Sequence, residues 1–193
     1  IDSYRDMSFT SRDTARAADI FNMNLKDKNA SVWMTLAGST SAGGCMQIYV
    51  DMVKNNMVDV IVATGASIVD MDFFEALGFK HYKGTPDIDD GLLRSLYIDR
   101  IYDTFIDEDQ LQKCDSTIAK IADSLEPRPY SSREFILEMG KWLIKHAKKK
   151  DSLVQAAYEN NVPIFCPAFT DSSAGFGLVY HQWHKSESHV SID

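Results

Sequence analysis

The sequence predicts an α/β fold with a Rossmann-like, mainly parallel sheet and helices on both of its faces. Three short apolar segments alternate with longer segments of helical periodicity, as expected for that fold class. The apolar segments are residues 31–36, 58–62 and 162–166. Each one runs into a loop rich in Gly, Ala, Ser and Thr, at residues 37–44, 63–70 and 167–177. Ligands bind at the carboxyl ends of strands in such folds, so the three loops predict one ligand site.

The first half of the chain predicts a helix, a strand, a second helix and a second strand. Thr10 and Asp13 have the spacing of a capping box, and apolar residues follow at helical intervals as far as Leu25. After the first strand, residues 45–54 are expected to form a helix with Ile48 on its apolar side. The second strand is almost continuously apolar, which is typical of a parallel strand covered on both faces.

Five further helices are expected after the second strand. They cover residues 70–77, 111–125, 132–150, 153–159 and 178–183. Gly78 is expected to end the first of them. Ser131 and Glu134 form a capping box for the third, and Asp151 is positioned to cap the fourth. Residues 83–91 are rich in turn formers and predict a surface loop.

Length and composition limit the classes of function. The 193 residues predict a single domain, and 45% hydrophobic and 25% charged residues are ordinary for a globular protein. The net charge of −8 argues against nucleic acid as a partner and is compatible with a cationic substrate such as a polyamine. No apolar run is long enough to span a membrane, and no secretory leader is expected.

The cysteines and histidines predict neither a disulfide framework nor a metal site. Cys45, Cys114 and Cys166 are far apart, odd in number and lack a CxxC pair, which favours a reducing, cytoplasmic compartment. His181 and His184 lie three residues apart, but no carboxylate or cysteine accompanies them. No metal cofactor is therefore expected.

The first loop, residues 37–44, is suited to a phosphate group. Its small residues let the backbone approach an anion, and the N-terminus of the following helix offers free N–H groups. It is not a P-loop, because Cys45 and Met46 stand where Lys and Ser or Thr are needed. A tight turn with hydroxyl caps is an equal alternative.

The second and third loops add polar groups to the same edge of the sheet. Thr64 and Ser67 can hydrogen-bond a ribose or a phosphate, and Asp70 can bind a ribose hydroxyl or an ammonium group. The alternative for Asp70 is that it caps the helix expected to begin there. Asp171 follows a strand and can accept hydrogen bonds from a ribose, or it forms an Asx-turn.

Four segments in order along the chain, residues 36–44, 56–60, 64–66 and 163–171, resemble deoxyhypusine synthase, and in particular its bacterial and archaeal deoxyhypusine-synthase-like branch. The resemblance implies a Rossmann-like fold and a homotetramer with NAD sites at a dimer interface. It implies a transferase that oxidises spermidine with NAD. The aminobutyl group then passes to an enzyme lysine and on to a lysine of the translation factor eIF5A, with no net redox change.

Position by position, the resemblance implies ten NAD-binding residues. They are Gly38, Ser39, Thr40, Ser41, Ala42, Thr64, Gly65, Ala66, Asp70 and Asp171. Asp70 is also implied to contact the amine substrate. Val69 and Phe176 stand where the family has acidic residues, which leaves open a different amine or a different acceptor.

The segment that carries the nucleophilic lysine in the family has no counterpart in residues 1–193. The domain is therefore expected to be truncated at its C-terminus and inactive alone. Two alternatives remain open at this point. One is a non-catalytic or split subunit that completes an NAD site with a partner chain. The other is a different NAD-binding Rossmann-like protein such as a sirtuin-like deacylase, which the absence of a zinc-binding cysteine set disfavours.

Overall fold

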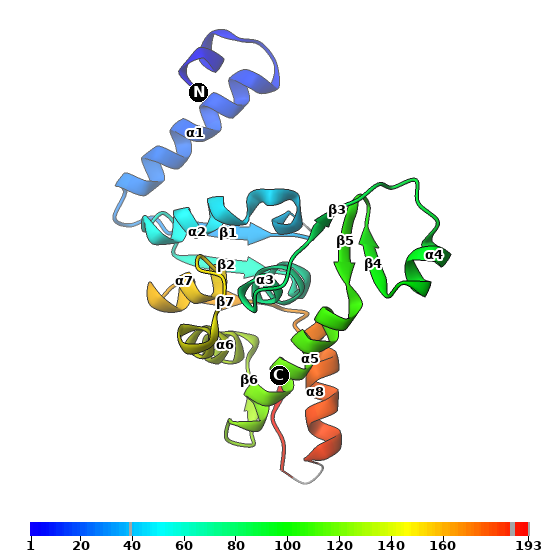
Figure 1. Cartoon of the computed structure of the whole chain (residues 1–193). Helices are drawn as coiled ribbons and strands as arrows, with labels where there is room; N and C mark the ends of the chain where they lie inside the picture. Colours follow the sequence, from blue (N-terminus) through cyan, green and yellow to red (C-terminus); the bar gives the residue numbers. More distant parts are fainter. Residues whose placement is uncertain (39, 186–187, 193) are drawn as a thin grey trace.

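The computed structural model describes residues 1–38, 40–185 and 188–192 (Figure 1). Its centre is a parallel sheet in the order β1-β2-β7, formed by Trp33–Leu36, Val60–Ala63 and Ile164–Phe165. Ile61 of the middle strand pairs with Met34 on one side and with Ile164 on the other. The predicted α/β class and all three parallel strands are confirmed, although each strand is shorter than its apolar segment.

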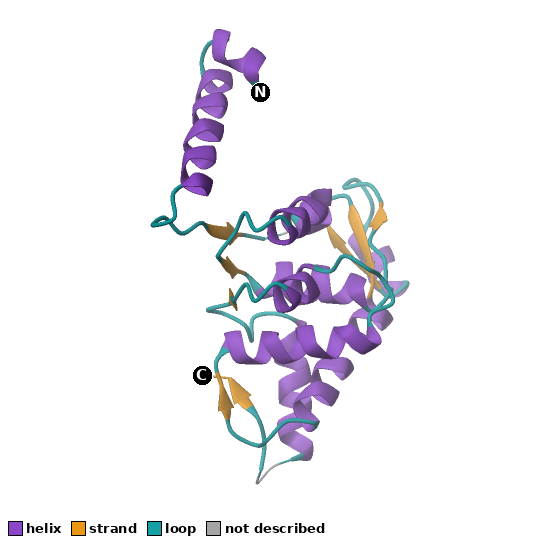
Figure 2. Cartoon of the chain, turned by 90° about the vertical axis from the view of Figure 1, so that its left-hand side faces the viewer, coloured by secondary structure: helices purple, strands orange, loops and turns teal. Residues whose placement is uncertain are grey.

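Helices cover one face of this sheet in the described structure (Figure 2). They are α2 (Met46–Lys54), the helical segment η3 (Ala66–Phe73), α3 (Phe74–Ala76), α6 (Ser132–His146) and α7 (Leu153–Glu159). The covered face presents buried Ile61 and Ile164, whereas Trp33 and Phe165 on the opposite face are 61% and 38% exposed. The expected second layer of helices is therefore not present within the described residues.

A small antiparallel sheet stands beside the main one, and the sequence did not predict it. Its order is β3-β5-β4, with strands Tyr82–Lys83, Thr104–Asp107 and Ile98–Ile101, and helix α4 (Asp90–Ser95) packs on β4. The hairpin between β4 and β5 turns through Tyr102, whose φ is +55°. Because hairpin turns of this kind usually contain Asn or Gly, a tyrosine at that position hides the turn from a sequence pattern.

Helices α5 (Glu108–Asp123) and α8 (Ser173–His184) pack against each other below the sheets in Figure 1. Gly177 lets them approach closely, because a Cβ there would lie 2.4 Å from the carbonyl oxygen of Asp115. A two-stranded parallel pair, β6 (Pro129–Tyr130) and β8 (Ser191–Ile192), holds the C-terminal end of the described chain. No described helix is long and apolar enough to cross a bilayer.

The N-terminal helix α1 (Thr10–Lys26) extends away from the body of the protein (Figure 1), and the 3₁₀ turn η1 (Asp2–Asp6) folds back on it through an ion pair between Arg5 and Asp19. The helix was predicted correctly, but its capping box was not. Phe9 occupies the N-cap position with a φ of +56°, and no side chain caps this end. Thr10 already lies inside the first turn.

Three other local predictions, each made from a short sequence pattern, were also wrong. Ile48 is 58% exposed, because α2 buries the side that carries Val50 and Val53. Helix α6 ends at His146 rather than at Lys150. Ser152, and not Asp151, caps α7 by accepting a hydrogen bond from the Gln155 amide. The Ser131 capping box and the stop at Gly78, with a φ of +90°, are confirmed.

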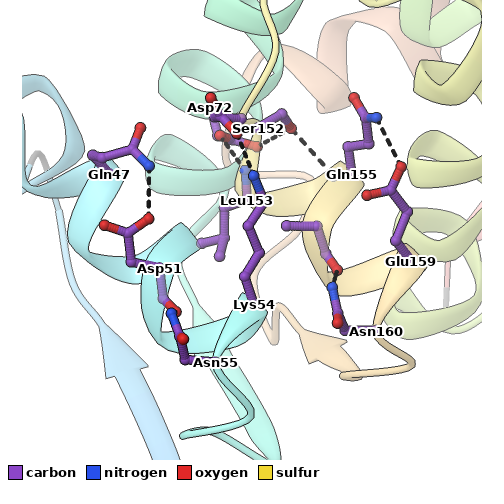
Figure 3. Close-up of polar contacts among 12 residues, drawn as sticks. Gln47, Asp51, Lys54, Asn55, Asp72, Ser152, Leu153, Gln155, Glu159 and Asn160 are labelled. Carbon is purple, nitrogen blue, oxygen red and sulfur yellow. Dashed lines mark hydrogen bonds and ion pairs between the residues drawn. The ribbon is translucent and has the colours of Figure 1, made fainter.

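A buried carboxylate joins η3 to α7. Asp72 is 3% exposed and accepts hydrogen bonds from the Ser152 hydroxyl at 2.7 Å and from the Leu153 and Val154 amides at 2.7 and 2.8 Å (Figure 3). The carboxylate thus satisfies amides that a helix leaves free in its first turn. This contact fixes the segment that follows β2, and that segment carries several of the predicted site residues.

Candidate functional site

The three loops predicted to form a site meet at the carboxyl edge of the main sheet. The Ser67 hydroxyl donates a hydrogen bond to the carbonyl oxygen of Gly38 at 2.6 Å, which ties the second loop to the first. Gly65 ties the second loop to the third, because a Cβ there would lie 2.6 Å from Cβ of Ser172. Ser67 is 1% exposed, so its predicted contact with a ligand is replaced by this internal one.

Asp70 points away from the start of its own helix and toward α8. One of its carboxylate oxygens accepts a hydrogen bond from the Ser173 amide at 2.9 Å. The helical segment that contains it begins at Ala66, so the alternative that Asp70 caps this segment is wrong. Burial raises the pKa of Asp70, the hydrogen bonds from Ser173 offset part of the rise, and the charge of Asp171 adds to it.

Asp115 of α5 is a third carboxylate of this region, and the sequence did not single it out. Burial raises its pKa to about 6, the nearby Ser173 hydroxyl offsets part of the rise, and the charges of Asp70 and Glu108 add to it. One of its oxygens is buried and accepts no hydrogen bond within the described residues. The sequence does contain a signal for Asp115, because this charged residue lies on the inner side of an amphipathic helix, between buried Cys114 and Ile118.

A cavity of about 630 Å³ opens beside the third loop, and this size suits a small ligand. Asp70 and Asp171 line it, together with Phe176 and with the C-terminal pair Ser191 and Ile192. Its lining contains no Lys, Arg or His among the described residues. The cavity is therefore an environment of negative potential, which favours a cation.

The N-cap residues of the two helical segments that follow β1 and β2 provide no side-chain cap. The first segment is η2 (Ser41–Cys45), which leads into α2. The second is η3 after Gly65, where the Thr64 hydroxyl instead accepts a hydrogen bond from the Ser67 amide at 3.4 Å. Five later helices are capped by side chains, namely those of Asp89, Asp107, Ser131, Ser152 and Ser172. The open start of η2 leaves backbone N–H groups free at the carboxyl edge of the sheet, which is the arrangement that binds phosphate groups.

The first loop also has room and a free hydroxyl for a ligand. Ser41 is 7% exposed, and its hydroxyl has no hydrogen-bond partner in the described structure. A Cβ at Gly38, Gly43 or Gly44 would meet no atom within 4 Å. An orphaned buried hydroxyl beside open glycines and free amides fits a dinucleotide pyrophosphate.

The remaining predicted residues surround this loop. Thr40 and Thr64 are exposed, and Ala42 and Ala66 are half-buried. Ser39 lies outside the described residues. The structure thus brings the first, second and third loops together, as predicted, and adds Asp115 to them.

Two cysteines lie near the cavity, but burial suppresses their reactivity. Burial raises the pKa of Cys166 to about 11 and that of Cys114 well above its usual range, and the charge of Asp70 adds to both shifts. A thiol with such a pKa is not ionised at neutral pH and is a poor nucleophile. In the part of the chain that the structure describes, no group of three His, Cys, Asp or Glu side chains could hold a metal ion.

Comparison with known proteins assigns the family. A family model described as deoxyhypusine synthase matches residues 1–193. The chain belongs to the deoxyhypusine synthase family. Its relatives include a deoxyhypusine synthase-like protein of Caulobacter vibrioides, 72% identical over 96% of this chain and 51% of the relative. A deoxyhypusine synthase-like protein of Coxiella burnetii is 68% identical over 100% of this chain and 55% of the relative.

The chain therefore spans about half the length of these curated relatives. A crystal structure of a protein assigned as a deoxyhypusine synthase from Entamoeba histolytica has the same fold. Its TM-score is 0.72 at 18% identity, over 100% of this chain and 65% of that one. This likeness, together with the parallel sheet, confirms the Rossmann-like α/β class. Members of the family are generally transferases.

Proposed function

We propose that this chain forms the NAD-binding and amine-binding part of a deoxyhypusine-synthase-like transferase. The observation that carries the proposal is the pairing of the uncapped start of η2 and the orphaned Ser41 hydroxyl with an adjacent acidic cavity. The first arrangement is suited to an anionic dinucleotide and the second to a cationic substrate. An enzyme that oxidises an amine with NAD needs both, side by side.

Each loop has a separate task toward the cofactor. The free amides after Thr40 and the Ser41 hydroxyl would hold the pyrophosphate, and Asp171 would accept hydrogen bonds from a ribose. Bound NAD supplies a hydride acceptor for a carbon next to an amine nitrogen. Ser67 holds the second loop to the first, and Gly65 allows the third loop to pack closely against the second.

The carboxylates would bind the amine, which is spermidine or a related polyamine. Asp70 and Asp171 line the cavity and Asp115 lies behind Ser173, so that ammonium groups find negative charge along it. Phe176 and Leu111 give the cavity an apolar wall.

The aminobutyl group would pass to a lysine, and finally to a lysine or amine acceptor such as an eIF5A-like protein. Among the described residues, no lysine lines the cavity. We therefore infer that the nucleophilic lysine comes from outside these 193 residues, either from the same polypeptide or from a partner chain. The chain alone is expected to bind ligands without catalysing transfer, and a split subunit remains the second candidate. Cytoplasmic location stays a prediction.

A homo-oligomer, a tetramer by resemblance, is part of the proposal. Helix α8 presents Phe176, Val179, Tyr180 and Trp183 on one side, with exposures of 74, 48, 56 and 80%. Large apolar side chains spaced three and four residues apart form a stripe typical of a helix that contacts another protein surface. Sedimentation of the chain at micromolar concentration tests this, because a monomer would contradict it.

The amine site is tested by titrating spermidine into the NAD-saturated chain at pH 5.5 and pH 7.5. The pKa of about 6 means that Asp115 is mostly protonated at the lower pH and ionised at the higher one, and burial raises the pKa of Asp70 in the same direction. A single carboxyl of pKa about 6 goes from roughly one quarter to almost full ionisation, so affinity should rise by about fourfold or more. The variant Asp115→Asn should show a smaller rise. Equal or tighter binding at pH 5.5 would contradict the proposal.

A further inference from the structure

A buried histidine holds the last described segment of the chain. His181 of α8 is 3% exposed and lies between α5 and the backbone of residues 188–192. Its Nδ1 is 2.7 Å from a carboxylate oxygen of Asp123, and its Nε2 accepts a hydrogen bond from the Val190 amide at 2.9 Å. These two contacts join a helix, a carboxylate and a terminal strand through one ring.

The contacts fix the protonation of the ring. A backbone amide can only donate, so Nε2 of His181 must carry a lone pair and the proton must be on Nδ1, where it is donated to Asp123. The ring is therefore neutral in the folded protein. The next residue, Gln182, donates a hydrogen bond to the Val190 carbonyl at 3.2 Å. Both backbone groups of Val190 are thus held by consecutive residues of α8.

The segment held in this way is a wall of the candidate cavity. Ser191 and Ile192 follow Val190 directly, pair with Pro129 and Tyr130, and line the cavity together with Asp70 and Asp171. Gln182 lines it too. Val190 is fully buried, so its position is set by these hydrogen bonds and by packing rather than by solvent.

We propose that Asp123 and His181 act as a positioning pair that places residues 190–192 against the amine cavity, and that the pair requires the neutral imidazole. This inference rests on the proposed function for its effect on ligand affinity, but not for its effect on the strand. Asp123 from α5 is the charged group that contacts the ring. A second proton on Nε2 would remove the acceptor of the Val190 amide and release the strand, while Asp123 kept its contact.

Two isosteric variants separate the two contacts. In His181→Gln the side-chain oxygen can replace Nε2 as acceptor for Val190, whereas in His181→Asn the side-chain nitrogen replaces only Nδ1 as donor to Asp123. Amide hydrogen exchange of residues 190–191 should accelerate about tenfold in His181→Asn and stay close to wild type in His181→Gln. Asp123→Ala changes a half-exposed residue, so it should fold, and exchange should accelerate there too. His184→Gln, on the exposed side of α8, is the matched control.

Ligand binding completes the test. The Kd of spermidine for the NAD-saturated full chain should rise about tenfold in His181→Asn and be restored in His181→Gln, with helical content unchanged by circular dichroism. The inference would be overturned if amide exchange were equal in all variants, or if His181→Asn and His181→Gln lost the same affinity for spermidine. If wild type binds no spermidine while the exchange pattern holds, the proposed function fails and the positioning of the strand stands.

Discussion

Replacing Asp171 by alanine is expected to weaken NAD binding by about 10- to 100-fold while leaving the free energy of unfolding almost unchanged. Asp171 is exposed at the cavity, and its carboxylate accepts no hydrogen bond from the described residues. The fold therefore loses little when it is removed, whereas a ribose would lose a charged acceptor. Calorimetric titration of NAD and urea unfolding measure the two quantities on the same preparation.

Asp13→Ala is the matched control for this experiment. Asp13 is also an exposed aspartate, but it lies on α1, which extends away from the body of the protein (Figure 1). Its removal gives the same change in net charge without touching the cavity. If Asp13→Ala weakens NAD binding as much as Asp171→Ala does, the effect is a general one of charge and Asp171 has no specific role.

Replacing Asp72 by alanine is expected to cost about 3 to 5 kcal/mol of folding stability, the largest effect on the fold that we predict. The carboxylate is buried and is the acceptor for the Ser152 hydroxyl and for the first amides of α7 (Figure 3). Alanine leaves those donors buried without an acceptor. Urea unfolding measures the loss. Asp51→Ala, which removes one exposed contact with Gln47 on α2, should cost less than about 0.5 kcal/mol.

The same unfolding measurement has a predicted pH dependence. Burial raises the pKa of Asp72 to about 6 from a usual 3.8, and its three hydrogen bonds offset only part of that rise. The carboxyl of Asp72 therefore binds a proton more readily in the folded protein than in the unfolded chain. Above pH 6 the charged carboxylate lowers the free energy of unfolding. This loss of stability disappears as Asp72 is protonated between about pH 6 and pH 4, so the contribution of Asp72 alone makes the free energy of unfolding rise as the pH falls through that range. Asp72→Ala should lose this component, and an unchanged pH profile would contradict the assignment.

The parts of the fold that follow from hydrophobic pattern could be predicted from sequence. The three parallel strands, α2, α5, α6 and α7 were expected, because their apolar periodicity is set by burial against the same core. The three site loops were expected for a related reason. Small residues after a buried strand leave room for a ligand, and the parallel order of the strands brings their carboxyl ends to one edge.

The parts that depend on contacts between distant residues could not be predicted in this way. A local cap was one alternative for Asp70, but its partner is the amide of Ser173, 103 residues away. Ser152 caps α7 in place of Asp151 because Asp72, 80 residues earlier, holds its hydroxyl. Asp115 lies on the inner side of α5, but its place at the site depends on the packing of α5 against α8, which the sequence pattern does not show. The resemblance to a family supplied the identities of the site residues, and the structure supplied their partners.

The most direct test of the central claim, that the loops after β1 and β2 bind NAD, is calorimetric titration of NAD into the chain and into Gly43→Val. A Cβ at Gly43 meets no protein atom within 4 Å, so valine should fold normally and fill only the space reserved for the ligand. The account predicts saturable, one-to-one binding by wild type and binding weaker by about tenfold or more in the variant. Absence of saturable binding by wild type, or equal affinity in Gly43→Val, would contradict it.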